Sequence, residues 1–322
     1  MAAGLTAAPA FYLEKKDLLD TFILFQRTAK DGTMNYTTTA TLIIALLLGL
    51  LSAGNCLAGS NNYDTDFTPA WKMKQSDWSD PAEIRRTWNE AIVSIPAGPG
   101  KVYETLMQEL DRSKIPAGKR FATIIYLHGC SGVWLGTYDR TDFLARHGFA
   151  VIAPVSFARK KYPKSCDPER SRGGFYRGTL KMRQYDAEYA IVQAKTLDWV
   201  DPENVFLMGL SQGAITVATL HSEDPRARVR ARIIEGWTCH AVWPEYRGLK
   251  APAGEPVLSL VAAKDPWFRQ CCQGDCGSFM NKENGSRSIV YKKGKLRRCH
   301  ELLAYPQARK AVLDFLRQQM KK

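Results

Sequence analysis

Uninterrupted apolar runs recur through the later two-thirds of the chain. The run FATIIYLHG at 121–129 is long enough for one strand and has no polar alternation, as expected of a strand buried on both faces of a sheet. Five further segments, each built around a short apolar core, predict further strands: FAVIAPVSFA (149–158), NVFLMGL (204–210), ARIIEGW (231–237), PVLSLVAA (256–263) and SRSIVYKK (286–293).

Helix-compatible segments lie between these runs. They are DRTDFLARHG (139–148), LKMRQYDAEYAIVQAKTLDWV (180–200), SQGAITVATLHS (211–222) and the closing PQARKAVLDFLRQQM (306–320). Strands that alternate with helices predict a parallel sheet covered by helices on both faces. In such sheets the loops at the carboxyl ends of the strands carry the chemistry.

The segment before residue 121 gives weaker signals. SDPAEIRRTWNEAI predicts a capped helix that begins near Ser79, and KVYETLMQEL at 101–110 predicts a strand.

Residues 32–63 contain no charged side chain, and 40–53 are almost wholly apolar. This apolar core fits a secretory signal and is short for a membrane span, which needs roughly 20 residues.

We therefore divide the chain into an upstream and signal segment, 1–58, and a single domain, 59–322. Ala58 gives a plausible cleavage site, and we interpret Met34 as the working start. Contact with a membrane is expected only if this segment stays uncleaved; lipid attachment at Cys56 is a weaker alternative, because Asn55 stands where a small residue is wanted. A secreted or periplasmic protein follows.

The chain has 322 residues and a net charge of +13. Residues 1–58 hold equal numbers of basic and acidic side chains, so the whole excess belongs to the domain. A basic surface suits nucleic acid, anionic surfaces or acidic substrates, or simply keeps a protein soluble. Because the sequence contains no nucleic-acid-binding motif, we expect no nucleic-acid partner.

Eight cysteines are many for a cytosolic enzyme and favour disulfides in an oxidising compartment. We expect Cys299 to pair with Cys271, Cys272 or Cys276, which would restrain the neighbouring His300, and we expect Cys130 to be the free thiol. A zinc site formed by residues 271, 272 and 276 is the weaker alternative, because structural zinc usually takes four ligands. We therefore expect no metal.

The turn Gly209-Leu210-Ser211-Gln212-Gly213 lies between a predicted strand and a predicted helix. A sharp turn of this kind strains the serine backbone and exposes its hydroxyl, and glycines on both sides leave room for close packing. Ser211 is therefore the candidate nucleophile.

A serine nucleophile needs a histidine base and an acid that orients it, in the chain order serine, acid, histidine. Asp265 directly follows the apolar run SLVAA, and His300 alone among the five histidines follows Asp265. We expect His240 to be structural or part of a pocket wall. The amides of Gln212 and of Cys130, in YLHGCSG, are the candidate oxyanion donors.

At this point a resemblance emerges. LHGCSG, VDPENVFLMGLSQGA, AAKDPW and CHELLAYPQARKAVLDFL together resemble the α/β-hydrolase superfamily, specifically bacterial dienelactone-hydrolase-related proteins, over about 103–322. The resemblance implies a single α/β-hydrolase domain that acts on esters or lactones without a metal or organic cofactor. Dienelactone hydrolases proper use a cysteine where this chain has Ser211, which favours a serine esterase here.

Two functions remain in competition: a serine hydrolase of small carboxylic esters or lactones, and a catalytically silent binding protein with the same fold. For a hydrolase, two basic loops bear on the choice of substrate. They either form a positive mouth that favours anionic esters or are ordinary solvated loops; their basic residues are Arg159, Lys160, Lys161, Lys164, Arg170, Arg172, Arg177, Lys292, Lys293, Lys295, Arg297 and Arg298.

Overall fold

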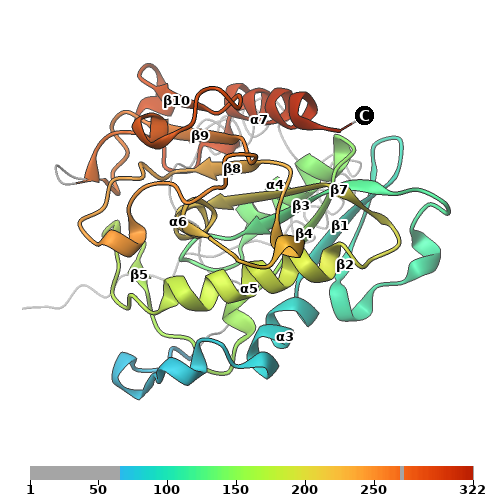
Figure 1. Cartoon of the computed structure of the whole chain (residues 1–322), viewed down its shortest axis with the longest axis horizontal. Helices are drawn as coiled ribbons and strands as arrows, with labels where there is room; N and C mark the ends of the chain where they lie inside the picture. Colours follow the sequence, from blue (N-terminus) through green and yellow to red (C-terminus); the bar gives the residue numbers. More distant parts are fainter. Residues whose placement is uncertain (1–65, 269–271, 322) are drawn as a thin grey trace, which may run out of the picture. The chain divides into compact units, whose positions relative to one another are not determined.

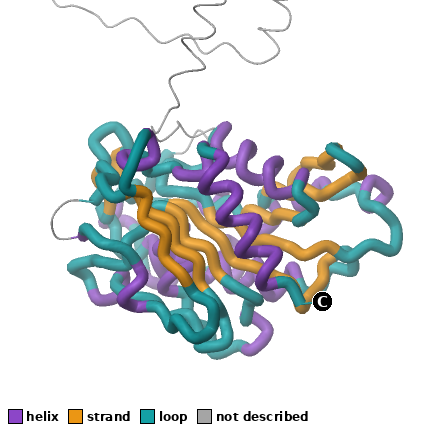
Figure 2. The backbone as a smooth tube through the Cα atoms, turned by 90° about the horizontal axis from the view of Figure 1, so that it is seen from above, coloured by secondary structure: helices purple, strands orange, loops and turns teal. Residues whose placement is uncertain are grey.

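A computed structural model describes residues 66–268 and 272–321. The predicted signal segment, its cleavage site and Cys56 lie outside the described residues. The main feature is an eight-stranded sheet with the order β10-β9-β8-β7-β3-β4-β1-β2 (Figures 1 and 2). Its strands are β1 (Ile92–Gly98), β2 (Lys101–Leu106), β3 (Phe121–Leu127), β4 (Ala150–Ala153), β7 (Val200–Leu210), β8 (Arg232–Glu235), β9 (Val257–Ala262) and β10 (Arg287–Tyr291).

The six strands that the apolar runs predict are all present, and they pair in parallel. Every residue of β3, β4, β8 and β9 is buried, as expected of strands that helices cover on both faces. The predicted fold class, an α/β domain with a mostly parallel sheet, is therefore confirmed.

In the described part of the chain five α-helices cover the sheet, and the hydrophobic core is correspondingly split in two. Residues of α4 (Leu135–Arg146) and α7 (Pro306–Gln319) pack into the core on one face. Residues of α3 (Pro81–Asn89), α5 (Thr179–Ala194) and α6 (Gln212–Thr219) pack into the core on the other face (Figure 1). The predicted helices at 139–148, 180–200, 211–222 and 306–320 correspond to α4, α5, α6 and α7.

The antiparallel edge of the sheet is the part that the apolar runs do not predict. β1 pairs antiparallel with both β4 and β2, and β2 ends at Leu106 instead of continuing to residue 110. Pro96 lies within β1, and the register shifts between Pro96 and Gly98. A proline and a bulge weaken the strand signal, since proline cannot donate a ladder hydrogen bond.

The loops after β3, β7, β8, β9 and β10 all lie at the carboxyl edge of the parallel strands. A two-stranded ribbon of β5 (Cys166–Asp167) and β6 (Arg172–Gly173) interrupts the basic loop that follows β4. Among residues 66–268 and 272–321, no helix has the length and apolar character that a membrane crossing requires. The same residues contain two disulfides, which fit an oxidising compartment.

Candidate active site

Ser211 occupies a strained turn between β7 and α6. Its φ of 55° and ψ of −114° lie in a region that non-glycine residues rarely adopt. The flanking glycines are required sterically, because a Cβ on Gly209 would lie 2.5 Å from the Gly213 carbonyl carbon and one on Gly213 would lie 2.1 Å from the Leu127 carbonyl oxygen. The predicted strand, turn and helix around Ser211 are therefore present.

Asp265 and His300 meet at the carboxyl edge although they follow different strands. Asp265 lies beyond the end of β9, and His300 lies between β10 and α7. His300 Nδ1 is 2.8 Å from Asp265 Oδ2, and both side chains are buried. Trp267 stacks on the imidazole with 5.1 Å between ring centroids. The carboxylate and the indole together fix the orientation of the ring.

The other ring nitrogen of His300, Nε2, is not held by the carboxylate of Asp265. His300 Nε2 is buried and has no hydrogen-bond partner among the described residues. Ser211 and His300 line the same small cavity, together with Gly129 and Cys130. With a carboxylate at Nδ1, the proton sits on Nδ1 and the Nε2 lone pair is available as a base.

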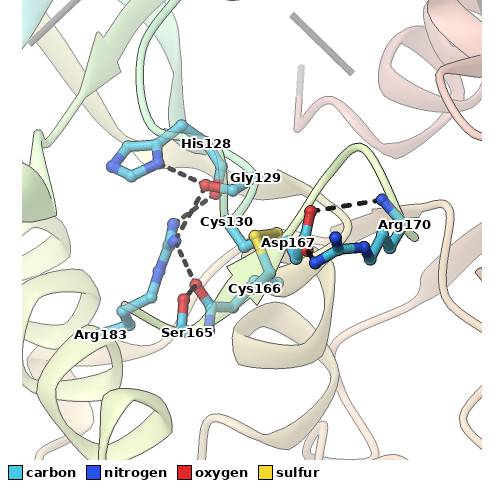
Figure 3. Close-up of a disulfide and its surroundings, with 9 residues drawn as sticks. His128, Gly129, Cys130, Ser165, Cys166, Asp167, Arg170 and Arg183 are labelled. Carbon is cyan, nitrogen blue, oxygen red and sulfur yellow. Dashed lines mark hydrogen bonds and ion pairs between the residues drawn. A yellow bond between two sulfur atoms is a disulfide. The ribbon is translucent and has the colours of Figure 1, made fainter. Parts of the chain in front are cut away.

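Cys130 lies in the loop after β3, beside Ser211, and its thiol is not free. It forms a disulfide with Cys166 of β5 (Figure 3). The expectation of a free Cys130 is therefore wrong, because the ribbon of β5 and β6 folds back over the loop and brings the two cysteines together. Cys130 and Gln212, the residues of the two predicted oxyanion donors, also line one larger cavity with Ser211.

The predicted disulfide between Cys299 and Cys271, Cys272 or Cys276 is only partly tested. Cys276 forms a disulfide with Cys239 in the loop after β8, so it is excluded as the partner of Cys299. Cys299 is itself disulfide-bonded, and Cys271, another predicted partner, lies outside the described residues. Among the described residues no group of His, Cys, Asp or Glu is arranged to hold a metal ion.

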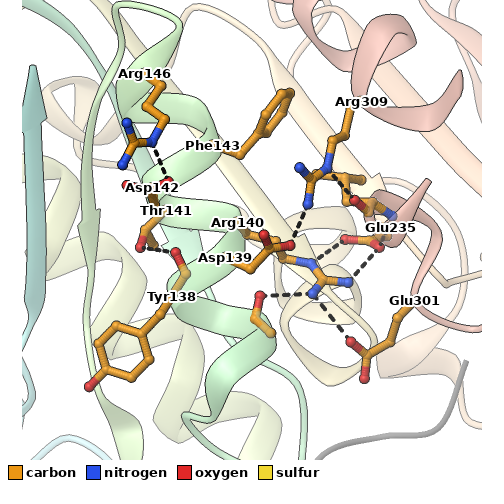
Figure 4. A network of polar contacts seen from close by, with 12 residues as sticks. Tyr138, Asp139, Arg140, Thr141, Asp142, Phe143, Arg146, Glu235, Glu301 and Arg309 are labelled. Atoms are coloured by element: carbon orange, nitrogen blue, oxygen red, sulfur yellow. Dashed lines mark hydrogen bonds and ion pairs between the residues drawn. The ribbon is translucent and has the colours of Figure 1, made fainter. Parts of the chain in front are cut away.

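A buried ion-pair cluster connects the Ser211 turn to the segment after His300. No local pattern in the sequence predicts this cluster. Arg140 donates to both carboxylate oxygens of Glu235, at 2.9 and 3.1 Å, and lies 3.2 Å from Glu301 Oε2 (Figure 4). The Glu235 carbonyl accepts the Ser211 N–H at 2.8 Å, and its carboxylate accepts the Leu303 N–H at 2.8 Å. Glu235 thus ties the serine turn to the segment that follows His300.

Glu301 and Glu235 both contact the guanidinium of Arg140. Burial, and secondarily the negative charge of Glu235, raise the pKa of Glu301 to about 7, although the Arg140 charge opposes this rise. Glu301 also lines the small cavity that holds Ser211 and His300. A titrating carboxyl group therefore lies beside the candidate base.

The larger cavity has a volume of about 330 Å³ and mostly apolar walls. Its aromatic walls are Trp237, Trp243, Tyr246, Trp267 and Phe268, with Val242 and Ile215 beside them. His240, which follows the Cys239 turn, packs against Phe279 with 5.1 Å between ring centroids and is not among the residues that line this cavity. A space of this size and lining suits an apolar or aromatic group of a small molecule.

Several of the basic residues expected at the mouth have other roles. Arg159 is buried, lies 2.5 Å from Asp186, and donates to the main-chain carbonyls of Asp77 and Trp78. For Arg159 both expectations, a place at a positive mouth and a place in a solvated loop, are therefore wrong, since the guanidinium is buried and joins α5 to the segment before α3. Arg177 pairs with Glu245. None of the described residues that line the larger cavity is Lys or Arg.

The sheet, the strained serine turn after β7 and the carboxylate–histidine pair beyond β9 and β10 together define an α/β-hydrolase fold. Solved structures that resemble the chain include a dienelactone hydrolase-like promiscuous phosphotriesterase from metagenomic libraries, with 13% identity over 72% of this chain and 100% of that one (TM-score 0.44). Others are esterase 2 of Thermogutta terrifontis (14% identity, 62% of this chain and 84% of that one, TM-score 0.40) and an acylaminoacyl peptidase of Pyrococcus horikoshii (15% identity, 65% of this chain, TM-score 0.42).

This chain spans only 38% of the length of the Pyrococcus horikoshii peptidase. No protein-family model matches the sequence, and no curated protein matches it. The α/β-hydrolase fold of this chain follows from its own sheet order and serine turn.

Proposed function

We propose that the protein is a serine hydrolase that cleaves small carboxylic esters or lactones through an acyl-enzyme intermediate. One observation carries the proposal: His300 and Ser211 line the same small cavity, and His300 has a buried Nε2 without a hydrogen-bond partner among the described residues while its Nδ1 is held by Asp265. Nucleophilic catalysis by serine needs a histidine whose ring is oriented by an acid and whose other nitrogen can accept the hydroxyl proton, and these observations support that role for His300.

In the proposed reaction Ser211 Oγ attacks the ester carbonyl carbon while His300 Nε2 takes the hydroxyl proton. The amides of Cys130 and Gln212 donate to the oxyanion of the tetrahedral intermediate. The imidazolium of His300 returns the proton to the leaving alcohol as the C–O bond breaks, and Asp265 stabilises the imidazolium. Water, deprotonated by the same nitrogen, then releases the acid from Ser211.

The cavity walls support a substrate with an uncharged, apolar or aromatic group beside the reacting carbonyl. The indoles of Trp237, Trp243 and Trp267 are among the aromatic groups that line the cavity. The preference for anionic esters, expected from the basic loops, stays a prediction. A matched pair of neutral and carboxylated esters at low and high salt tests it, because salt screens a positive mouth and leaves apolar contacts nearly unchanged.

Labelling with a fluorophosphonate probe tests the proposed function. We expect the wild-type chain to be labelled and Ser211→Ala to be unlabelled, with turnover reduced to a residual ~10³–10⁴ over water. Ser131→Ala is the matched control, because Ser131 lines the same small cavity and should leave labelling intact. If wild type is not labelled and hydrolyses no ester, the alternative of a catalytically silent binding protein gains support.

A further inference from the structure

Arg183 lies on α5 beneath the loop after β3, and its guanidinium points into the backbone of that loop (Figure 3). The side chain is 1% exposed. Its Nη2 donates to the His128 carbonyl, and its Nη1 lies 3.3 Å from the Gly129 carbonyl oxygen. Arg183 takes part in none of the ion pairs found in the part of the chain that the structure describes. Its contacts with the loop are to main-chain carbonyls alone.

The Gly129 carbonyl belongs to the same peptide unit as the Cys130 N–H. Because a trans peptide is planar, its C=O and N–H point in opposite directions, so a donor that fixes the carbonyl also fixes the direction of the amide. Hydrogen bonds that follow one another through a peptide unit polarise one another. A peptide whose carbonyl accepts a hydrogen bond therefore has an N–H that is a stronger donor. By donating to the Gly129 carbonyl, Arg183 therefore orients and polarises the Cys130 N–H, the first proposed oxyanion donor.

His128 supports the same carbonyl. Its Nε2 accepts the Ser156 N–H at 3.2 Å, so the proton sits on Nδ1, which donates to the Gly129 carbonyl at 2.7 Å. Burial lowers the pKa of His128 well below its ordinary value, and the Arg183 charge lowers it further. A neutral imidazole and a guanidinium thus both donate to the peptide that carries the Cys130 amide.

The second proposed oxyanion donor is also tied to Arg183. Gln212 Oε1 accepts from Arg183 Nη1 at 3.2 Å and from Ser165 Oγ at 3.2 Å. The side chain of Gln212 is buried, and its own N–H is the amide that follows the nucleophile. One guanidinium therefore contacts both Gly129, whose carbonyl shares a peptide unit with the Cys130 N–H, and the side chain of Gln212, although these residues lie in different loops.

The charge of Arg183 has a further effect. The Asp186 carboxylate lies 2.5 Å from the guanidinium of the neighbouring Arg159 and is paired with it, so it does not pair with Arg183. A positive charge in a water-poor site acts more strongly on charge that develops nearby than it would in water. An oxyanion at the Cys130 amide would lie on the far side of the Gly129–Cys130 peptide, whose carbonyl Arg183 holds.

We propose that Arg183 is the positioning residue of the oxyanion hole: it orients and polarises the Cys130 amide, anchors Gln212, and supplies a buried positive charge that stabilises the tetrahedral oxyanion. The proposal rests on the proposed serine hydrolase function. Arg183 does not touch the substrate, so its effect should appear in the transition state and not in ground-state binding.

Steady-state kinetics and a transition-state analogue test the proposal in Arg183→Met and Arg183→Lys. We expect kcat for a p-nitrophenyl ester to fall roughly 10- to 100-fold in Arg183→Met, somewhat below the ~10²–10³ that removal of an oxyanion donor costs, while KM changes less than about threefold. Affinity for an alkyl trifluoromethyl ketone, whose adduct carries the oxyanion, should fall in proportion to kcat/KM. Arg183→Lys keeps the charge without the planar fork and should fall between wild type and Arg183→Met.

Arg232→Lys is the matched control for the loss of a buried arginine. Arg232 is 3% exposed and donates to the Val217 and Leu220 carbonyls at 2.8 Å, but it lies where β8 begins, at the opposite edge from Ser211. We expect Arg232→Lys to unfold at a lower temperature with kcat nearly unchanged. If the Arg183 variants lose no more kcat than Arg232→Lys, or if their affinity for the ketone equals that of wild type, Arg183 has only a structural role and the proposal is wrong.

The experiment separates failure of this proposal from failure of the proposed function. If Ser211→Ala keeps its activity, the serine mechanism itself is wrong. If Ser211→Ala is inactive while folded Arg183→Lys and Arg183→Met both turn over at the wild-type rate, the serine mechanism stands and only the assignment of Arg183 is overturned. Should Arg183→Met fail to fold, the kinetics and ketone affinity of Arg183→Lys alone decide between these outcomes.

Discussion

Replacing Glu301 by Gln should change how the stability of the fold depends on pH. Glu301 is buried beside Arg140, whose positive charge is already paired with Glu235. The fold therefore holds Glu301 most easily in its protonated form, and its pKa is raised from the usual 4.5 to about 7. Gln is close in shape to a protonated glutamate and can still accept from the Arg140 guanidinium.

The magnitude follows from the pKa. A carboxyl group that titrates near 7 in the folded state and near 4.5 in the unfolded state contributes about 3 kcal/mol. The folded state binds more protons between these values, so this contribution is fully present below about pH 4.5 and is lost as pH rises through about 7. Gln does not titrate, so Glu301→Gln should keep the contribution that wild type loses.

Urea unfolding at pH 5 and at pH 8.5 measures the effect. We expect Glu301→Gln and wild type to have similar unfolding free energies at pH 5, and the variant to be more stable by up to about 3 kcal/mol at pH 8.5. Glu283→Gln, at an exposed position, controls for the loss of one carboxylate from the net charge. Parallel stability curves for Glu301→Gln and wild type across this range would show that Glu301 is ionised in the fold throughout.

Three substitutions probe the geometry around the candidate nucleophile. Gly213→Ala should cost about 3 kcal/mol or more and abolish turnover, because the new Cβ would lie 2.1 Å from the Leu127 carbonyl oxygen; a normal melting temperature would contradict this. Cys166→Ser should cost about 2–5 kcal/mol and lower kcat more than it raises KM, because the Cys130 loop loses its disulfide; unchanged kinetics would mean that the loop needs no such restraint. Asp265→Asn should lower kcat about 10⁴-fold in stopped-flow acylation through loss of the imidazole tautomer, and a loss below tenfold would exclude Asp265 as the orienting acid.

The strands and the candidate triad were predictable because each has a local or ordered signal. β3, β8 and β9 are buried on both faces, and a doubly buried strand must be an apolar run. The positions of Asp265 and His300 follow from chain order in a fold whose strand ends share one edge. The Asp265–His300 hydrogen bond at 2.8 Å agrees with that order.

The disulfide partners and the buried arginines depend on contacts between distant segments, which carry no local signal. Cys130 pairs with a residue 36 positions away because a short ribbon folds over its loop. Arg159 and Arg140 look like surface residues in the sequence, yet each lies inside the protein against a distant carboxylate. A guanidinium is buried only where a partner compensates its desolvation, and the pairing appears only in the folded chain.

The backbone strain at Ser211 has an evolutionary consequence. A φ of 55° at a residue with a side chain costs of order 1–3 kcal/mol, and glycine would adopt the same conformation at little steric cost. Ser211→Gly should therefore give a protein that is at least as stable as wild type and lacks the proposed nucleophile. Selection for stability alone would remove the serine, so under the proposed function a lineage that keeps this residue in this turn is held there by the benefit of the reaction, and drift toward glycine would mark descendants that no longer need it.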